Sequence, residues 1–218
     1  GCQWAASLNE PKVSYIKSPR NCGFGAGHNL AIKASSDFDG YFLICNPDIS
    51  FDKQSLDKLV SFAWINEYNF VSPQIIYKNG ERQYSCRLLP TPSNLFLRRF
   101  LPTTAIKYDA TYELKDAEYD KVFSPPSVSG CFMLLTNVLL QKLNGFDERY
   151  FMYLEDVDLC RRALQLTKIY YCPETTIVHV FNKGSYKSKL LLWYHIRSDI
   201  TYFNNWGWVF DKKRYAYN

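Results

Sequence analysis

An apolar run at residues 41–45, Tyr-Phe-Leu-Ile-Cys, ends at Asn46-Pro47-Asp48. Because the run does not alternate with polar residues, it predicts a parallel strand covered on both faces of a sheet. Proline cannot continue a central ladder, so the strand should stop there. Strand patterns at 13–16, 69–76, 127–135, 168–171 and 176–180 alternate with helical patterns at 30–36, 55–66, 137–142 and 155–166. This alternation predicts an α/β fold with a mixed central sheet.

The composition is that of a globular protein in a reducing compartment. Apolar residues make up 47% and charged residues 22% of the 218 positions, which excludes disorder as the main state. No apolar run approaches the roughly 20 residues that span a bilayer, so no transmembrane segment is expected. The seven cysteines include no C-x-x-C pair. They predict buried free thiols and a cytoplasmic location rather than disulfides or a zinc site.

The surplus of positive charge is confined to residues 182–218, which we separate from a domain over residues 1–181. The net charge is +5, and residues 1–181 contain 19 basic and 19 acidic residues, whereas 182–218 contain seven basic, two acidic and ten aromatic residues. Two interpretations stay open for this segment: contact with a membrane surface or anionic polymer, or helix docking with a solvated lysine face. Because the body is neutral and no nucleic-acid motif occurs, nucleic-acid binding is not expected.

The glycine-rich segment Gly23–His28 fits neither common phosphate-binding fingerprint. The dinucleotide pattern requires glycine at position 28, which is His28, and no Gly-Lys-Ser/Thr follows for a P-loop. The segment leads into a predicted helix, and amides at a helix N-terminus can face an anion. A simple turn explains the segment equally well.

Three carboxylates, Glu155, Asp156 and Asp158, lie in the first turn of a predicted helix. One or two carboxylates would be enough to cap that helix, at about 0.3–1 kcal/mol each. The third favours a general base at the mouth of an apolar pocket. Gly130 interrupts a predicted strand, as happens where a ligand or another backbone comes close. His179, alone in a strand, indicates nothing by itself.

The order of these segments resembles family 2 glycosyltransferases, most closely the bacterial rhamnosyltransferases of O-antigen and cell-wall polysaccharide assembly. The resemblance covers roughly residues 13–205 and is most specific in the run GFDERYFMYLEDVDLCRR, residues 145–162. It implies a GT-A-like single domain that binds a nucleotide-sugar, dTDP- or UDP-linked, together with Mg²⁺ or Mn²⁺.

The resemblance also implies a role for particular residues. Asp48 would hold the metal, and His179 would complete the metal site or contact the diphosphate. Asp156 would be the general base that deprotonates the acceptor hydroxyl, and Glu155 would position a sugar. Gly130 would leave room for that sugar. The implied cofactor-binding set is Asn21, Gly23, Gly25, Asn29, Asn46 and Gly130.

The function implied is inverting, metal-dependent transfer of a sugar, with L-rhamnose as the first candidate, to a polysaccharide or lipid-linked oligosaccharide. Such acceptors lie at the inner face of the cytoplasmic membrane, which would give residues 182–218 a purpose. Family members begin with two strands that end in a Thr-Tyr-Asn-like motif and in an aspartate. The first 22 residues match neither motif, so a βα unit on the order of 30 residues is expected to be missing. The alternative hypothesis is a catalytically silent GT-A fragment that binds glycan or a partner transferase.

Overall fold

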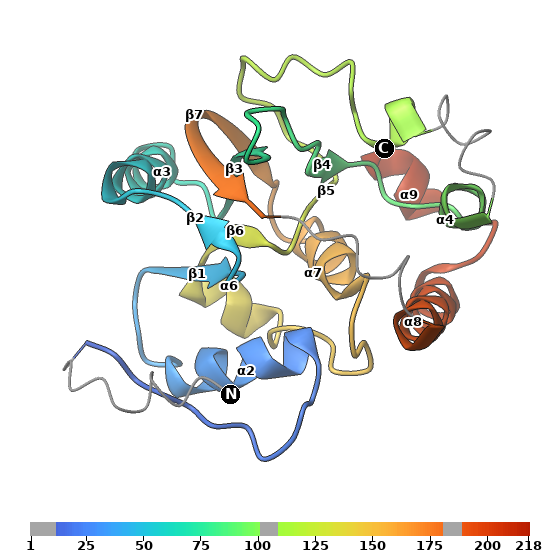
Figure 1. The fold of residues 1–218 in the computed structure, drawn as a ribbon, viewed down its shortest axis with the longest axis horizontal. Helices are drawn as coiled ribbons and strands as arrows, with labels where there is room; N and C mark the ends of the chain where they lie inside the picture. Colours follow the sequence, from blue (N-terminus) through green and yellow to red (C-terminus); the bar gives the residue numbers. More distant parts are fainter. Residues whose placement is uncertain (1–11, 101–108, 181–188) are drawn as a thin grey trace.

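The computed structural model describes residues 12–100, 109–180 and 189–218 (Figure 1). Its helices are α2 (Phe24–Ala34), α3 (Lys53–Ile65), α4 (Pro92–Phe100), α6 (Asn137–Lys142), α7 (Glu155–Ala163), α8 (Lys189–Trp206) and α9 (Lys212–Tyr217). Its strands are β1 (Tyr41–Cys45), β2 (Ile49–Ser50), β3 (Phe70–Ile76), β4 (Cys86–Arg87), β5 (Ser127–Val128), β6 (Phe132–Thr136) and β7 (Tyr170–His179).

The central sheet has the strand order β1-β6-β3-β7-β2, and β4 and β5 form a separate pair. Strands β3 and β7 are parallel, whereas β1 and β3 are antiparallel to β6 and β2 is antiparallel to β7. The mixed sheet expected from the sequence is therefore confirmed. The expectation of a parallel strand at 41–45 is wrong, because β1 pairs antiparallel with β6 at the edge of the described sheet. An apolar run specifies burial but not the direction of the neighbouring strand.

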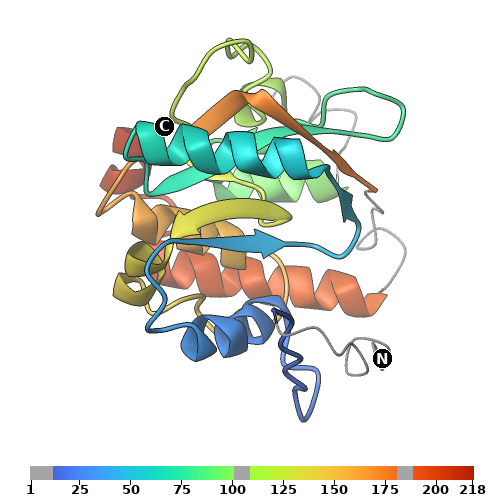
Figure 2. The same cartoon turned by 90° about the vertical axis from the view of Figure 1, so that its left-hand side faces the viewer.

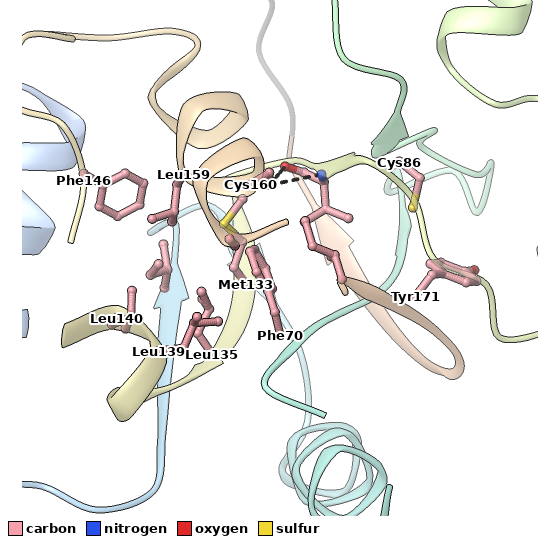
Figure 3. Packing of buried hydrophobic residues seen from close by; sticks show 14 of the residues in the cluster. Phe70, Cys86, Met133, Leu135, Leu139, Leu140, Phe146, Leu159, Cys160 and Tyr171 are labelled. Atoms are coloured by element: carbon pink, nitrogen blue, oxygen red, sulfur yellow. Dashed lines mark hydrogen bonds between the residues drawn. The ribbon is translucent and has the colours of Figure 1, made fainter. Parts of the chain in front are cut away.

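Helices cover both faces of the sheet, so the molecule has three layers (Figures 1 and 2). Alternate residues of β6 point to opposite layers. Phe132 and Leu134 pack with α3, whereas Met133 and Leu135 pack with the buried faces of α2, α6 and α7 (Figure 3). This alternation follows from the two-residue period of a strand. The α/β class predicted from the sequence is confirmed.

Three other predicted strands differ from the structure. The apolar run at residues 13–16 is irregular and exposed, and it pairs with no strand among the described residues. The runs at 168–171 and 176–180 belong to one strand, β7, whose register against β3 shifts between Pro73 and Gln74. The predicted interruption at Gly130 is confirmed, since β5 and β6 lie on either side of it in different sheets.

The described part of residues 182–218 packs against the main body. Tyr202 and Phe203 of α8 are buried in a cluster with Tyr150 and Val157. In α8 the spacing of the exposed apolar residues Leu190, Trp193, Ile196 and Ile200 places them on one face. The docked helix expected as one interpretation is therefore present, while the boundary predicted at 181/182 lies outside the described residues. Within the ranges described, no helix combines the length and apolar character needed to cross a bilayer.

Candidate active site

The chain enters α7 through an unusual turn. Tyr153 and Leu154 have φ angles of 72° and 62°, a left-handed conformation that costs non-glycine residues about 1–3 kcal/mol each. The turn sets the direction in which Glu155 and Asp156 leave the helix N-terminus. Such backbone strain is typical of functional sites, where the surrounding structure maintains it.

Asp156 is held against Gly130 by a direct contact. Its Oδ2 accepts a hydrogen bond of 2.9 Å from the backbone N–H of Gly130, and its Oδ1 accepts one of 2.8 Å from Val157 N–H. A Cβ at position 130 would lie 2.9 Å from the Cβ of Asp156. The room that Gly130 leaves is therefore occupied by the Asp156 side chain, and contact between Gly130 and a sugar stays a prediction.

Glu155 is buried beside Asp156, with only 6% of its surface exposed. Burial, and then the charge of Asp156, raise the pKa of Glu155 to about 8. Its Oε2 has no hydrogen-bond partner among the described residues. At neutral pH the group is mainly a neutral carboxylic acid, which can donate a hydrogen bond to a sugar oxygen.

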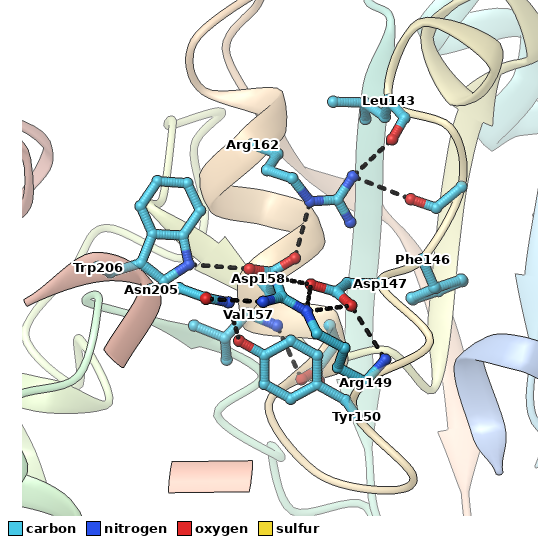
Figure 4. A network of polar contacts seen from close by, with 12 residues as sticks. Leu143, Phe146, Asp147, Arg149, Tyr150, Val157, Asp158, Arg162, Asn205 and Trp206 are labelled. Atoms are coloured by element: carbon cyan, nitrogen blue, oxygen red, sulfur yellow. Dashed lines mark hydrogen bonds and ion pairs between the residues drawn. The ribbon is translucent and has the colours of Figure 1, made fainter. Parts of the chain in front are cut away.

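The third carboxylate of this helix has a structural role. Asp158 is buried, and its two oxygens accept hydrogen bonds of 2.7 Å from Arg162 Nε and 2.8 Å from Trp206 Nε1 (Figure 4). Trp206 is the last residue of α8, so this hydrogen bond connects α8 to α7. Two aspartates of one sequence motif thus have different roles: Asp158 is buried and structural, whereas Asp156 is half-buried and is the candidate base.

Asp48 and His179 meet where β2 pairs with β7, at one edge of the sheet. The pairing of β2 with β7 places Ile49 opposite His179, and Asp48 Oδ1 lies 3.5 Å from His179 Nε2. Burial lowers the pKa of His179 more than the nearby Asp48 raises it. A neutral imidazole is the form that coordinates metals. The structure therefore brings together the two residues predicted to hold a metal.

Gln83 orients His179, and sequence reasoning missed it. Its Oε1 lies 3.0 Å from His179 Nδ1, so it accepts a hydrogen bond when that nitrogen carries the proton. Contacts of this kind fix the tautomer and ring orientation of metal-binding histidines. No spacing in the sequence could have revealed the pair, because the two residues are 96 positions apart.

The oxygen atoms near Asp48 fit a hard cation. Asn46 Oδ1 and Asp48 Oδ1 are buried and have no hydrogen-bond partner within the part of the chain that the structure describes. Oxygen and imidazole ligands suit Mg²⁺ or Mn²⁺. The described residues contain no group of three or more His, Cys, Asp or Glu placed to hold an ion. Substrate oxygens and water would therefore have to complete the coordination.

Cys131 connects the two halves of the site. Its carbonyl accepts a 2.9 Å hydrogen bond from Asn46 N–H, and its thiol is buried. Burial raises the pKa of this thiol to about 12; the charges of Asp156 and Asp48 add to this effect, while a hydrogen bond with Ser129 and the charge of Arg87 oppose it. One side chain is thus within electrostatic reach of the candidate base, the candidate metal ligand and an arginine that sequence reasoning missed.

The predicted nucleotide-binding residues of α2 contact a different segment, residues 145–151. Gly23 has a φ of 95°, and a Cβ there would collide with the carbonyl oxygen of Phe151. A Cβ on Gly25 would lie 2.7 Å from Phe146. The buried amide of Asn29 donates to Phe146 O at 2.9 Å and accepts from Phe146 N–H at 2.8 Å.

These contacts hold the loop that leads to α7. Asn21 accepts a local hydrogen bond of 3.2 Å from Gly23 N–H. Nucleotide binding by Asn21, Gly23, Gly25 and Asn29 stays a prediction. A cavity of about 330 Å³ adjoins this region, lined by Asn29, Lys33, Leu143, Asn144, Phe146, Asp147, Glu148 and Arg162. It includes neither Asp48 nor Asp156, so it is not the place where the candidate catalytic groups meet.

Comparison with known sequences gives consistent matches. The sequence profile of Glycosyl transferase family 2 matches residues 3–114. Rhamnosyltransferase WbbL of Escherichia coli (strain K12) is 29% identical over 191 residues, covering 83% of this chain and 69% of the relative. The N-acetylglucosaminyl-diphospho-decaprenol L-rhamnosyltransferase of Mycobacterium tuberculosis is 27% identical over 199 residues, which cover 82% of this chain and 62% of that relative. The low-salt glycan biosynthesis hexosyltransferase Agl10 of Haloferax volcanii is 26% identical over a region that covers 74% of this chain and 48% of that relative. The chain spans about half to two thirds of the length of these relatives.

A solved structure shares the fold. GalNAc-T7, crystallised with UDP, GalNAc and Mn²⁺, superposes with a TM-score of 0.56 at 12% sequence identity. The match covers 79% of this chain and 33% of that protein. The GT-A-like fold expected from the sequence is thereby confirmed.

Proposed function

The chain belongs to glycosyltransferase family 2, and from this premise we propose that it transfers a sugar with inversion at the anomeric carbon. The first candidate is L-rhamnose from a dTDP- or UDP-linked donor, because two relatives are named as rhamnosyltransferases. The observation that carries the proposal is the link through two consecutive residues, Gly130 and Cys131. The N–H of Gly130 donates to Asp156, and the carbonyl of Cys131 accepts from Asn46, which begins the turn that carries the Asp48–His179 pair. A transferase needs a base on one side of the reacting carbon and charge stabilisation on the other.

In the proposed reaction, Asp156 accepts the proton of an acceptor hydroxyl. The hydroxyl oxygen forms a bond to the anomeric carbon while the bond from that carbon to the phosphate oxygen breaks. The nucleoside diphosphate leaves with the electron pair, so no covalent enzyme intermediate is needed. The hydrogen bond from Gly130 fixes the carboxylate for this step, and neutral Glu155 donates a hydrogen bond to a sugar oxygen.

Asp48 and His179 would hold a divalent cation on the donor side, with Asn46 Oδ1 as a further oxygen ligand. When bound, Mg²⁺ or Mn²⁺ would neutralise the negative charge that develops on the leaving diphosphate. Gln83 keeps the His179 ring in place. The nucleotide and Mn²⁺ in the fold relative support this assignment by likeness of fold.

The proposed acceptor is a sugar joined to a lipid through a diphosphate. The name of the Mycobacterium tuberculosis relative describes such an acceptor. The exposed apolar face of α8, with Trp193 among its residues, supports contact with a membrane surface. Sedimentation with anionic vesicles tests this contact, since replacement of Trp193 and Ile196 by serine should release the protein. Unchanged sedimentation of that variant would contradict it.

Calorimetric titration with dTDP and with UDP tests the donor site, first with Mn²⁺ and then with EDTA. We expect metal-dependent binding that Asp48→Ala weakens by at least about tenfold, as loss of a metal-site residue commonly does. Asp57→Ala, an exposed change on α3, is the matched control and should bind like the wild type. Absence of nucleotide binding would contradict the proposal and favour the alternative hypothesis, a catalytically silent fragment that binds glycan.

A further inference from the structure

Arg87 lies in the short β4–β5 pair, whose second strand leads into the segment that holds the candidate base. In β4 the side chain of Cys86 enters the main core, so the side chain of Arg87 leaves from the opposite face of the strand. Arg87 pairs with Ser127, whose hydroxyl donates to the Arg87 carbonyl at 3.0 Å. Three residues beyond Ser127, Gly130 makes its hydrogen bond to Asp156. The strand pairing therefore ties Arg87 to the segment that holds Asp156.

Within the described ranges, the Arg87 guanidinium forms no hydrogen bond or ion pair, although its Nε is buried. The other buried or half-buried arginines there all have partners: Arg161 binds Asp211, Arg162 binds Asp158, and Arg214 binds Asp211 and Pro90. A half-buried cation without a partner loses the stabilisation that these three arginines have, and a bound anion would restore it.

The charges around Arg87 leave it available to an anion. Burial tends to lower the pKa of Arg87, but nearby Tyr112, Glu113 and Asp156 raise it overall. Glu113 is itself paired with Lys115 at 3.2 Å, so its charge is already countered. Asp156 becomes neutral when it accepts the acceptor proton in the proposed reaction. Positive charge is thus present on the side of the site where the acceptor is deprotonated.

The proposed metal site at Asp48 and His179 lies toward the other end of the chain segment that carries Arg87. Gln83, which contacts His179, precedes Arg87 by four residues. Four residues of extended chain span roughly 13 Å. The donor diphosphate already has a proposed cation at Asp48 and His179. The acceptor diphosphate is one sugar ring away from the hydroxyl that Asp156 would deprotonate, and it has no other assigned partner.

We propose that Arg87 binds the diphosphate of the acceptor. This inference rests on the proposed function, because it assumes that Asp156 faces the acceptor. An arginine suits the task, since its planar guanidinium binds two phosphate oxygens at once. Arg87 would thereby select acceptors that carry a diphosphate next to the reacting sugar over neutral glycans.

Binding of two probes to the protein with Mn²⁺ and nucleotide present tests the inference. The probes are N-acetylglucosaminyl-diphospho-farnesol and the neutral octyl N-acetylglucosaminide. We expect Arg87→Gln to weaken binding of the diphosphate probe by roughly 10- to 100-fold, the usual effect of losing charge-assisted hydrogen bonds. Binding of the neutral probe and of the nucleotide should stay unchanged. Arg82→Gln is the matched control, because Arg82 is exposed and lies five residues earlier.

The possible results separate this inference from the proposed function. Failure of the wild type to bind nucleotide contradicts the proposed function. Nucleotide binding without preference for the diphosphate probe contradicts only the inference, as does an unchanged Arg87→Gln variant. If Arg87→Gln loses nucleotide binding as strongly as it loses binding of the diphosphate probe, Arg87 belongs to the donor phosphates instead. If Arg87→Gln does not fold, Arg87→Lys carries the test, with a smaller loss expected because lysine cannot bind two oxygens in parallel.

Discussion

Gly130 and Asp156 form one unit, in which the backbone N–H of the glycine donates a 2.9 Å hydrogen bond to the aspartate Oδ2. A glycine is required at this position because a Cβ would approach the Cβ of Asp156 to 2.9 Å. The chain therefore leaves β5 and enters β6 at the residue that holds the candidate base. This relationship makes the orientation of the base sensitive to a single methyl group.

Gly130→Ala should impair transfer more than it impairs folding. Displacement of Asp156 is expected to lower kcat by roughly 10- to 100-fold, and crowding to lower the free energy of unfolding by about 1–3 kcal/mol. Gly27→Ala is the matched control, since a Cβ there meets nothing within 4 Å and alanine favours the helix. Kinetics and urea unfolding of both variants check this. Wild-type kcat in Gly130→Ala would show that the contact does not position the base.

Asp156→Asn should abolish transfer and leave nucleotide binding nearly intact. The amide keeps the size of the carboxylate but cannot accept the acceptor proton. A general base contributes about 10²- to 10⁴-fold to a rate, so a loss in that range is expected. Single-turnover transfer and calorimetry with the nucleotide measure the two quantities separately. Transfer at the wild-type rate would remove Asp156 from the role of base.

Glu155→Gln should change how stability depends on pH. Because the pKa of Glu155 is raised to about 8 in the folded protein, the unfolded chain releases this proton at lower pH than the folded chain does. Raising the pH between the two pKa values therefore destabilises the wild type, by up to about 1.4 kcal/mol per pH unit from this group. The glutamine variant lacks this contribution. Urea unfolding from about pH 5 to pH 9 should show a flatter profile for the variant. Parallel profiles would contradict the raised pKa.

Asp211→Ala should destabilise the docked C-terminal segment. Asp211 is buried between two arginines, with Arg161 Nη2 at 2.5 Å and Arg214 Nη1 at 3.8 Å. Removal of the carboxylate leaves both guanidinium groups without a buried counter-charge, which typically costs about 3–5 kcal/mol. The control Asp57→Ala breaks the exposed pair with Lys53 and should cost less than about 1 kcal/mol. Equal losses in urea unfolding would show that the buried pair contributes no more than a surface pair.

Features that depend on neighbouring residues could be predicted from the amino-acid sequence alone. The helix predicted at 137–142 matches α6, and the interruption at Gly130 lies between β5 and β6. Apolar periodicity and strand-breaking residues act over a few positions, so they can be interpreted locally. The run at 145–162 led to the family for the same reason, because its residues are contiguous.

Contacts between residues that are far apart in the chain could be known only from the folded structure. No pattern in the sequence indicated that β1 would run antiparallel to β6, or that residues 13–16 would have no strand partner in the described sheet. The sequence could not connect Gln83 with His179, bring Arg87 within electrostatic reach of Asp156, or separate the structural Asp158 from its neighbour. Strand pairing and side-chain contacts depend on the energy of packing segments that are far apart in the chain. No local pattern encodes that energy.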